Sequence, residues 1–480
     1  MKLKEYAQYD AIALASLISN NEVSTQELAN VAMQGIEKLN PTINAVVESY
    51  QPTPDKLKLT SYLTPLSGVP TLLKDTPIAK GIRAEYGSPL MKEYVTSQDS
   101  HIWHQLKKSG VVNLGRTHSS EFGIAAATES KAFGITRNPW NLDLSTAGSS
   151  GGAAAAVAAG FVPFAHATDG GGAIRTPAAY CGLVGLKPSR GRVSCAPGSA
   201  SGYNGLYCPF VMTRSVRDCS LLLDIVNGPV VGDYYQMPKP HQRFSDALLN
   251  PLQPLRIALT THSWSPSPTD QAMIDGTKRS ARLCELLGHH VEYASPTFNY
   301  EEFLAAQKII WSVHIYDNIK RITQAFDSTP SLENLQTGTF ALYEYGRQIS
   351  GAQFVHSISV YEQISRQIAS FFEQYDILLT PTTTTLPTPV GLYNPNQERL
   401  TMPQVFKQLE SVETFTALFN CAGNPAISLP LQVSDCGLPI GSQFIAGFGK
   451  DDLLLQLSAQ LERHVNWHER TPAHHVSNFD

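Results

Sequence analysis

The sequence has little excess of charge of either sign. Its 480 residues include 36 Lys or Arg and 41 Asp or Glu, which gives a net charge of −5. Nucleic acids and acidic membranes attract strongly basic surfaces, and this composition offers none overall. We therefore expect neither a nucleic acid nor a membrane as a partner. The hydrophobic fraction of 42% and the charged fraction of 16% are typical of a globular protein with a sizeable core.

Cysteine is also scarce, and its placement argues against two kinds of stabilised site. The seven cysteines are scattered and odd in number, and no two have CxxC spacing. This pattern disfavours a disulfide framework and a zinc knuckle, and it suits a reducing compartment. No group of histidines has metal-ligand spacing either. We expect no metal and no cofactor.

Long hydrophobic runs are absent. The first ten residues, MKLKEYAQYD, lack the apolar run of a signal peptide. The longest apolar stretch, 153–165, is too short to span a bilayer and contains Gly160 and Pro163. The expected location is the cytoplasm.

One stretch, residues 145–192, is instead unusually rich in Gly, Ala and Ser. It contains two glycine-rich turns, at 148–152 and 169–173. We expect a helix at 153–159 after the first turn and another starting at Arg175 after the second. The free N–H groups at a helix start point into the turn before it, so both turns present backbone donors.

The rest of the chain alternates between strand and helix patterns, which predicts an α/β fold. A capping box at Ser24 and Glu27 starts a helix that Pro41 is expected to end. We expect one domain over 1–480, with a mainly helical insert at 297–375 that shapes the substrate site. The aromatic residues of this insert are expected to form its own core. The expected strands are 66–75, 111–115, 161–167, 255–260, 290–294, 376–382, 425–430 and 439–446.

The glycine-rich turns admit more than one chemistry when they are considered alone. A phosphate-binding loop requires a lysine after its glycines, and neither turn has one. Residues 148–152 match the G-x-S-x-G pattern of α/β-hydrolases, centred on Ser150. That motif needs a strand leading into it, and residues 143–148 form a poor strand pattern. A hydrolase of this class is therefore a weak alternative.

An ordered set of motifs is more specific than either turn. The motifs are GVP at 68–70 with Lys74-Asp75, GRT at 115–117 with Glu121-Phe122, RNPW at 137–140, GSSGG at 148–152, DGGG at 169–172 with Ile174-Arg175, CGLVGLKP at 181–188, and 376–382. These motifs resemble those of the amidase signature family, and the C-terminal part resembles its 6-aminohexanoate cyclic dimer hydrolase branch. The resemblance implies a single α/β/α domain around a large mixed β-sheet, a small-molecule amide as substrate, and a homodimer.

The resemblance also implies a Ser–cis-Ser–Lys triad. Lys74 corresponds to the base, and Ser149 corresponds to the bridging serine in a cis peptide. The nucleophile position is residue 173, where this chain has alanine. The remaining expected roles are an oxyanion hole at Gly170, Gly171, Gly172 and Ala173, supporting contacts from Ser150, Asp169 and Arg175, and substrate contacts at Gly123 and Ala125.

The implied triad is physically consistent, because a serine hydroxyl needs a base within hydrogen-bond reach. Lysine acts as a base only when it is neutral, and its ordinary pKa is about 10.4. Burial among small apolar residues can lower that pKa by about 3 units. Ser149 can relay the proton because a hydroxyl donates and accepts.

Ala173 removes the attacking atom from this arrangement. Loss of a serine nucleophile reduces turnover about a million-fold. The chain is then either a natural amide-binding homologue or an amidase with a Ser→Ala change that holds an unreacted ligand. Because Lys74, Ser149 and the glycine turn are retained, the second interpretation is favoured. The parent enzyme would hydrolyse amides, with acyl transfer to an amine as an alternative.

Overall fold

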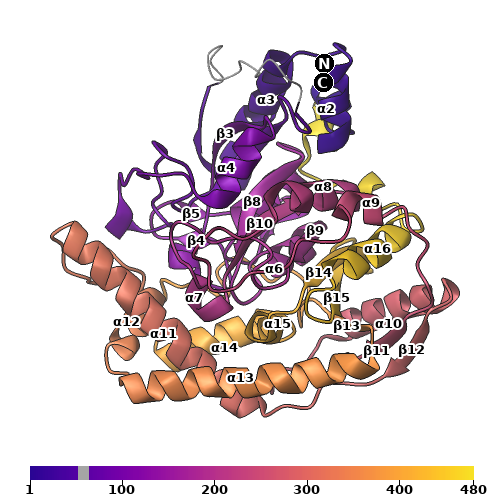
Figure 1. Ribbon diagram of the computed structural model, residues 1–480. Coiled ribbons are helices and arrows are strands. Elements are labelled where there is room, and N and C mark those ends of the chain that lie inside the picture. The colour runs from indigo at the N-terminus through magenta and orange to yellow at the C-terminus, as the bar shows by residue number, and fades with distance from the viewer. Residues whose placement is uncertain (52–63, 480) are drawn as a thin grey trace.

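A large mixed β-sheet forms the centre of the protein in the computed structural model, which describes residues 1–51 and 64–479 (Figure 1). Eleven strands form this sheet. Their spatial order is β1 (Val46–Ser49), β3 (Val112–Thr117), β2 (Pro70–Lys74), β8 (Phe164–Asp169), β10 (Cys208–Thr213), β9 (Val184–Lys187), β14 (Ala426–Val433), β15 (Pro439–Ala446), β13 (Ile377–Pro381), β11 (Arg256–Leu259) and β12 (His290–Tyr293). Two short hairpins accompany the sheet: β4 (Glu129–Ser130) with β5 (Gly134–Ile135), and β6 (Arg137–Asn138) with β7 (Asn141–Ser145).

The sheet combines parallel and antiparallel pairs of strands, and its edge strand β1 runs antiparallel to β3. Strand β2 runs parallel to β3 and to β8, and β11 runs parallel to β12 and to β13. The pairs from β8 through β10, β9, β14 and β15 to β13 are antiparallel. The sheet is therefore mixed, as the family resemblance implied.

Sixteen helices surround the sheet within the described part of the chain. They are α1 (Leu3–Tyr6), α2 (Ala11–Ser19), α3 (Thr25–Ile43), α4 (His101–Lys108), α5 (Gly151–Ala158), α6 (Arg175–Cys181), α7 (Gly202–Gly205), α8 (Val216–Val226), α9 (Phe244–Ala247), α10 (Gln271–Leu286), α11 (Tyr300–Ala325), α12 (Thr337–Gly346), α13 (Gly351–Gln374), α14 (Met402–Glu413), α15 (Ala417–Ala422) and α16 (Asp451–Glu462). This confirms the α/β class.

Helices cover both faces of the sheet, as successive residues of β15 show. A side chain at Gly441 would meet Ala179 of α6 at 2.5 Å, whereas Ser442 Oγ lies 2.8 Å from Ser280 Oγ of α10. Neighbouring side chains of a strand point to opposite faces. Helices α6 and α10 therefore lie on opposite faces, which gives the α/β/α layering.

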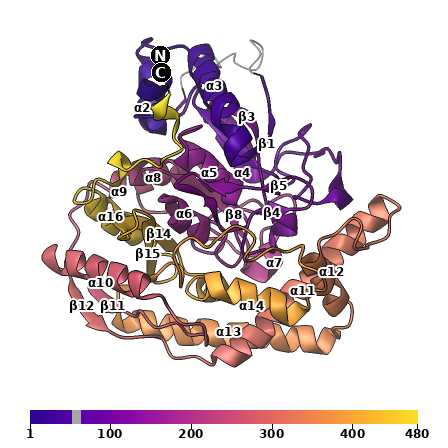
Figure 2. The ribbon, with the colours of Figure 1, turned by 180° about the vertical axis from the view of Figure 1, so that it is seen from behind.

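Helices α11, α12 and α13 lie side by side along one side of the molecule, away from the two termini (Figures 1 and 2). They occupy most of the region 297–375 expected to be a helical insert. The single domain over 1–480 and the substrate-shaping role of this insert stay predictions.

Three local expectations differ from the structure. Pro41 does not end its helix, because α3 continues to Ile43, whose side chain is fully buried in the core. Packing of Ile43 outweighs the lost hydrogen bond in the last turn. A strand, β7, does precede the GSSGG turn despite its poor pattern. Helices α14 and α15 were not predicted, and both carry residues of the site described below.

No helix in the described part of the chain is long and apolar enough to cross a membrane.

Candidate active site

The parallel pairing of β2 and β8 brings two functional residues to one edge of the sheet. Lys74 is the last residue of β2, and Asp169 is the last residue of β8. The carboxyl ends of parallel strands lie at the same edge. At this edge a cavity of about 830 Å³ opens, and its walls include Lys74, Ser149, Gly170, Gly171 and Ala173.

Lys74 is fully buried and is held by three hydroxyl groups. Its Nζ donates to Ser149 Oγ at 2.8 Å, to Ser150 Oγ at 2.8 Å and to Thr168 Oγ1 at 2.9 Å. Ser149 and Ser150 belong to the first glycine-rich turn, and Thr168 belongs to β8. The structure thus brings Lys74 and Ser149 together, and it adds Thr168 as a third partner.

Burial lowers the pKa of Lys74 from its ordinary value to about 7. The cause is loss of hydration of the ammonium, which the negative charges of Asp169 and Asp75 partly offset. At neutral pH a large fraction of the Lys74 side chain is therefore neutral. A neutral amine can accept a proton from the Ser149 hydroxyl.

Ser149 lies in a tightly enclosed turn. The peptide bond between Gly148 and Ser149 is cis. A side chain at Gly148 would lie 2.3 Å from the Ala125 carbonyl oxygen, so this position accepts only glycine without a shift of its surroundings. Ser150 accepts a hydrogen bond from Thr168 N at 3.3 Å, which ties the turn to β8.

The second turn presents its backbone to the cavity. No hydrogen bond from the N–H groups of residues 170–173 to another described residue is present. The turn fits closely against its neighbours: a side-chain carbon at Gly170 would lie 2.6 Å from Trp311, and one at Gly172 would lie 2.3 Å from Thr416 Oγ1. Unpaired N–H groups on a tightly held turn are suited to bind a developing oxyanion.

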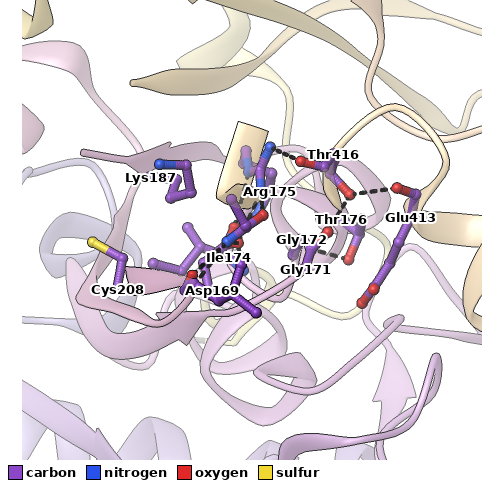
Figure 3. A network of polar contacts seen from close by, with 12 residues as sticks. Asp169, Gly171, Gly172, Ile174, Arg175, Thr176, Lys187, Cys208, Glu413 and Thr416 are labelled. Carbon is purple, nitrogen blue, oxygen red and sulfur yellow. Dashed lines mark hydrogen bonds and ion pairs between the residues drawn. The ribbon is translucent and has the colours of Figure 1, made fainter. Parts of the chain in front are cut away.

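Asp169 and Arg175 form a buried ion pair that holds this turn at both ends (Figure 3). Arg175 Nε and Nη2 each donate to the Asp169 carboxylate at 2.9 Å. Asp169 also accepts a hydrogen bond from Ile174 N at 3.2 Å. Despite its burial, the pKa of Asp169 lies below its ordinary value because of the Arg175 charge and of hydrogen bonds from Arg175 and Asn420. Arg175 therefore acts on the shape of the turn.

Ala173 ends the turn with its methyl group at the cavity wall, and it is 6% exposed. A methyl group can neither donate a proton nor attack a carbonyl. Residue 173 therefore shares a cavity with Lys74 and Ser149 but contributes no nucleophile.

The two candidate substrate contacts lie in different places. Gly123 lines the cavity, and a side chain there would meet Ser149 Oγ at 3.4 Å. Ala125 is absent from the described cavity wall and borders a smaller neighbouring pocket with Glu121. Trp311, expected in the core of the insert, packs against that core and also lines the main cavity.

The sequence reasoning missed several polar residues of the cavity, among them His166 and Glu413. His166 is two residues before Thr168 on β8, and its Nδ1 has no hydrogen-bond partner among the described residues. Burial lowers the pKa of His166 to about 3, so the ring is neutral. Glu413 ends α14 and reaches the cavity from a distant part of the chain. Residues two apart on a strand point to the same face, so the spacing of His166 and Thr168 could have indicated His166 from the sequence. No sequence pattern indicates Glu413.

Comparison with known proteins assigns the family. The Amidase family model matches residues 27–455. The chain is 34% identical over 481 residues to the 6-aminohexanoate-cyclic-dimer hydrolase of Paenarthrobacter ureafaciens, with 96% of each chain covered. It is 34% identical over 463 residues to a putative amidase AmiC of Mycobacterium tuberculosis, with 95% of each covered.

Solved structures agree with this assignment. A 6-aminohexanoate cyclic dimer hydrolase complexed with substrate superposes with a TM-score of 0.91 at 33% identity, covering 97% of this chain and 99% of that one. A bacterial aryl acylamidase of the amidase signature family superposes with a TM-score of 0.87 at 26% identity, covering 97% and 98%. The resemblance found in the motifs is confirmed, and the chain belongs to the amidase family.

Proposed function

We propose that this protein is an amide hydrolase whose acyl-enzyme forms on a serine at position 173, present here as an inactive Ala173 form. The observation that carries the proposal is the hydrogen bond from buried Lys74 Nζ to Ser149 Oγ, in the cavity that residue 173 also lines. The substrate would be a linear or cyclic small-molecule amide. The cyclic-dimer hydrolases similar to this chain make cyclic amides a reasonable part of that class.

In the proposed mechanism, neutral Lys74 takes a proton from Ser149, and Ser149 takes one from the serine at position 173. The serine oxygen then attacks the amide carbonyl carbon. The oxyanion that forms accepts hydrogen bonds from N–H groups of residues 170–173. The tetrahedral intermediate collapses when the amine leaves with a proton returned through Ser149. Water then attacks the acyl-enzyme by the same proton route and releases the acid.

The supporting residues keep this geometry. Ser150 and Thr168 fix the Lys74 amine, and the Asp169–Arg175 pair fixes the turn that carries residue 173. Retention of all these groups beside Ala173 favours a recent or deliberate Ser→Ala change. In its present form the site would bind an amide and leave it intact.

The substitution Ala173→Ser tests the proposal. We expect the variant to hydrolyse members of a panel of linear and cyclic amides and to be labelled by a fluorophosphonate, whereas the Ala173 form does neither. A rate increase of about a million-fold over the Ala173 form is the expected size. Correct folding of the variant is checked by circular dichroism.

Each other outcome has a distinct meaning. A folded Ala173→Ser protein with no hydrolysis and no labelling would contradict the hydrolase proposal. If the Ala173 form nevertheless bound amides, it would be a natural amide-binding homologue. Formation of a new amide in the presence of added amine would identify acyl transfer instead. The homodimer stays a prediction, which light scattering tests directly.

A further inference from the structure

A carboxyl group from α14 lies in the wall of the cavity beside the second glycine-rich turn. Glu413 Oε2 lies 2.5 Å from the point that a side-chain carbon on Gly171 would occupy. Figure 3 shows the Glu413 side chain extending away from Thr416 and past this turn, with no contact drawn to its carboxyl. Gly171 is two residues before position 173. Glu413 therefore adjoins the place where the amide would react.

Glu413 differs from the nearby carboxylates because it has no positively charged side chain as a partner. Asp169 pairs with Arg175 at 2.9 Å, and at the cavity wall Asp317 pairs with Arg321 at 3.0 Å. Within residues 1–51 and 64–479, the Glu413 carboxyl makes no hydrogen bond or ion pair. The other carboxylates of the site already have partners, so Glu413 is the carboxyl free to bind a ligand group.

Holding the unpaired Glu413 carboxyl at the cavity wall is energetically unfavourable, and this points to a ligand group that would pair with it. Burial, together with the charge of Asp169, raises the pKa of Glu413 to about 8. A half-buried carboxylate without a partner loses part of its hydration, and an ammonium group brought beside it would favour ionisation. Trp311 packs against Gly170 in the same wall, and an aromatic ring next to a cation adds further attraction.

Resting on the proposed function, we propose that Glu413 binds a protonated primary amine of the substrate. The geometry sets how far this amine lies from the reacting carbonyl. Two residues span at most about 7 Å of chain, so Gly171 and residue 173 are close. The substrate class is therefore an amide that carries a primary amine a few bonds from its carbonyl carbon.

Binding to the Ala173 protein tests this inference, because no turnover is needed. The probes are 4-aminobutanamide and pentanamide, which have the same number of heavy atoms and differ in an ammonium against a methyl group. Isothermal titration at neutral pH gives both dissociation constants. We expect 4-aminobutanamide to bind about tenfold tighter or more. The substitution Glu413→Gln should reduce this ratio to near one and leave pentanamide binding unchanged.

Asp317→Asn is the matched control, since it neutralises a cavity carboxylate that already has a partner. This variant should keep the preference for the amine. Equal binding of the two probes, no binding of 4-aminobutanamide at millimolar concentration, or an unchanged ratio in folded Glu413→Gln would each overturn the inference. Failure of the hydrolase proposal would appear separately, as inactive Ala173→Ser protein.

Discussion

At the scale of single residues, the site depends on one lysine whose surroundings change its chemistry. Lys74 would be an ordinary cation at the end of a strand if it were exposed. Three hydroxyl partners hold its amine in place, and full burial lowers its pKa to about 7. The same side chain therefore has the protonation state that a general base needs near neutral pH.

This state predicts how activity depends on pH. In the Ala173→Ser background, kcat/KM should rise with pH and level off above about 7, because the fraction of neutral Lys74 rises through its pKa. The substitution Lys74→Met should lower kcat by about a thousandfold or more and abolish this rise. Steady-state rates across the neutral range provide the measurement. A flat profile, or a folded Lys74→Met protein with normal rates, would rule out Lys74 as the base.

At the scale of elements, the two glycine-rich turns differ in what their glycines permit. Gly148 lets the first turn pass the Ala125 carbonyl, and Gly170 to Gly172 let the second turn fit against residues from α11, α14 and the start of α15. Gly172 also has φ +152, which non-glycine residues rarely adopt. The small residues of this stretch are thus required by contacts with elements far away in the sequence.

Gly172→Ala should therefore destabilise the protein by about 1–3 kcal/mol, because the added methyl group meets Thr416 Oγ1 and the backbone is strained. Urea unfolding measures the change. Gly351→Ala is the control, since Gly351 starts α13 and has no atom within 4 Å of the added carbon. Its free energy of unfolding should stay nearly unchanged. Equal effects of the two substitutions would contradict the close fit described here.

At the scale of the whole molecule, one buried arginine connects segments from distant parts of the chain. Arg175 pairs with Asp169 at the end of β8, and it also donates to Asn420 of α15 at 2.6 Å and to Gln443 of β15 at 2.8 Å. These contacts join the turn of the site to the C-terminal half of the sheet. The ion pair is therefore a structural connection as well as a support for residues 170–173.

Arg175→Met should lower the free energy of unfolding by about 3–5 kcal/mol, because it leaves the buried Asp169 charge without its partner. Adding Asp169→Asn in the same chain should restore part of this loss. Urea unfolding of the single and double variants gives both values. The single substitution Asp169→Asn gives the loss of unfolding free energy expected without coupling. If adding Asp169→Asn to Arg175→Met caused that same further loss, the two residues would not be coupled.

The sequence allowed much of this organisation to be predicted, where the signal was local. The capping box at Ser24 and Glu27 is present, and the sheet, most of its strands and the family agree with expectation. Lys74 and Ser149 were named from motifs, and the structure places them in contact. Glu413 and the inward position of Trp311 could not be predicted, because they depend on how α14 and α11 pack against a turn more than a hundred residues earlier.

The origin of the cavity wall has a consequence for how relatives of this protein can diverge. The lysine, the two turns and their supports come from 74–175, whereas Trp311, Asp317, Arg321 and Glu413 come from helices after residue 300. Substitutions in those helices can change the shape and charge of the chamber while the bond-making groups stay as they are. New selectivity can therefore arise by altering one segment of the chain while the other is inherited unaltered.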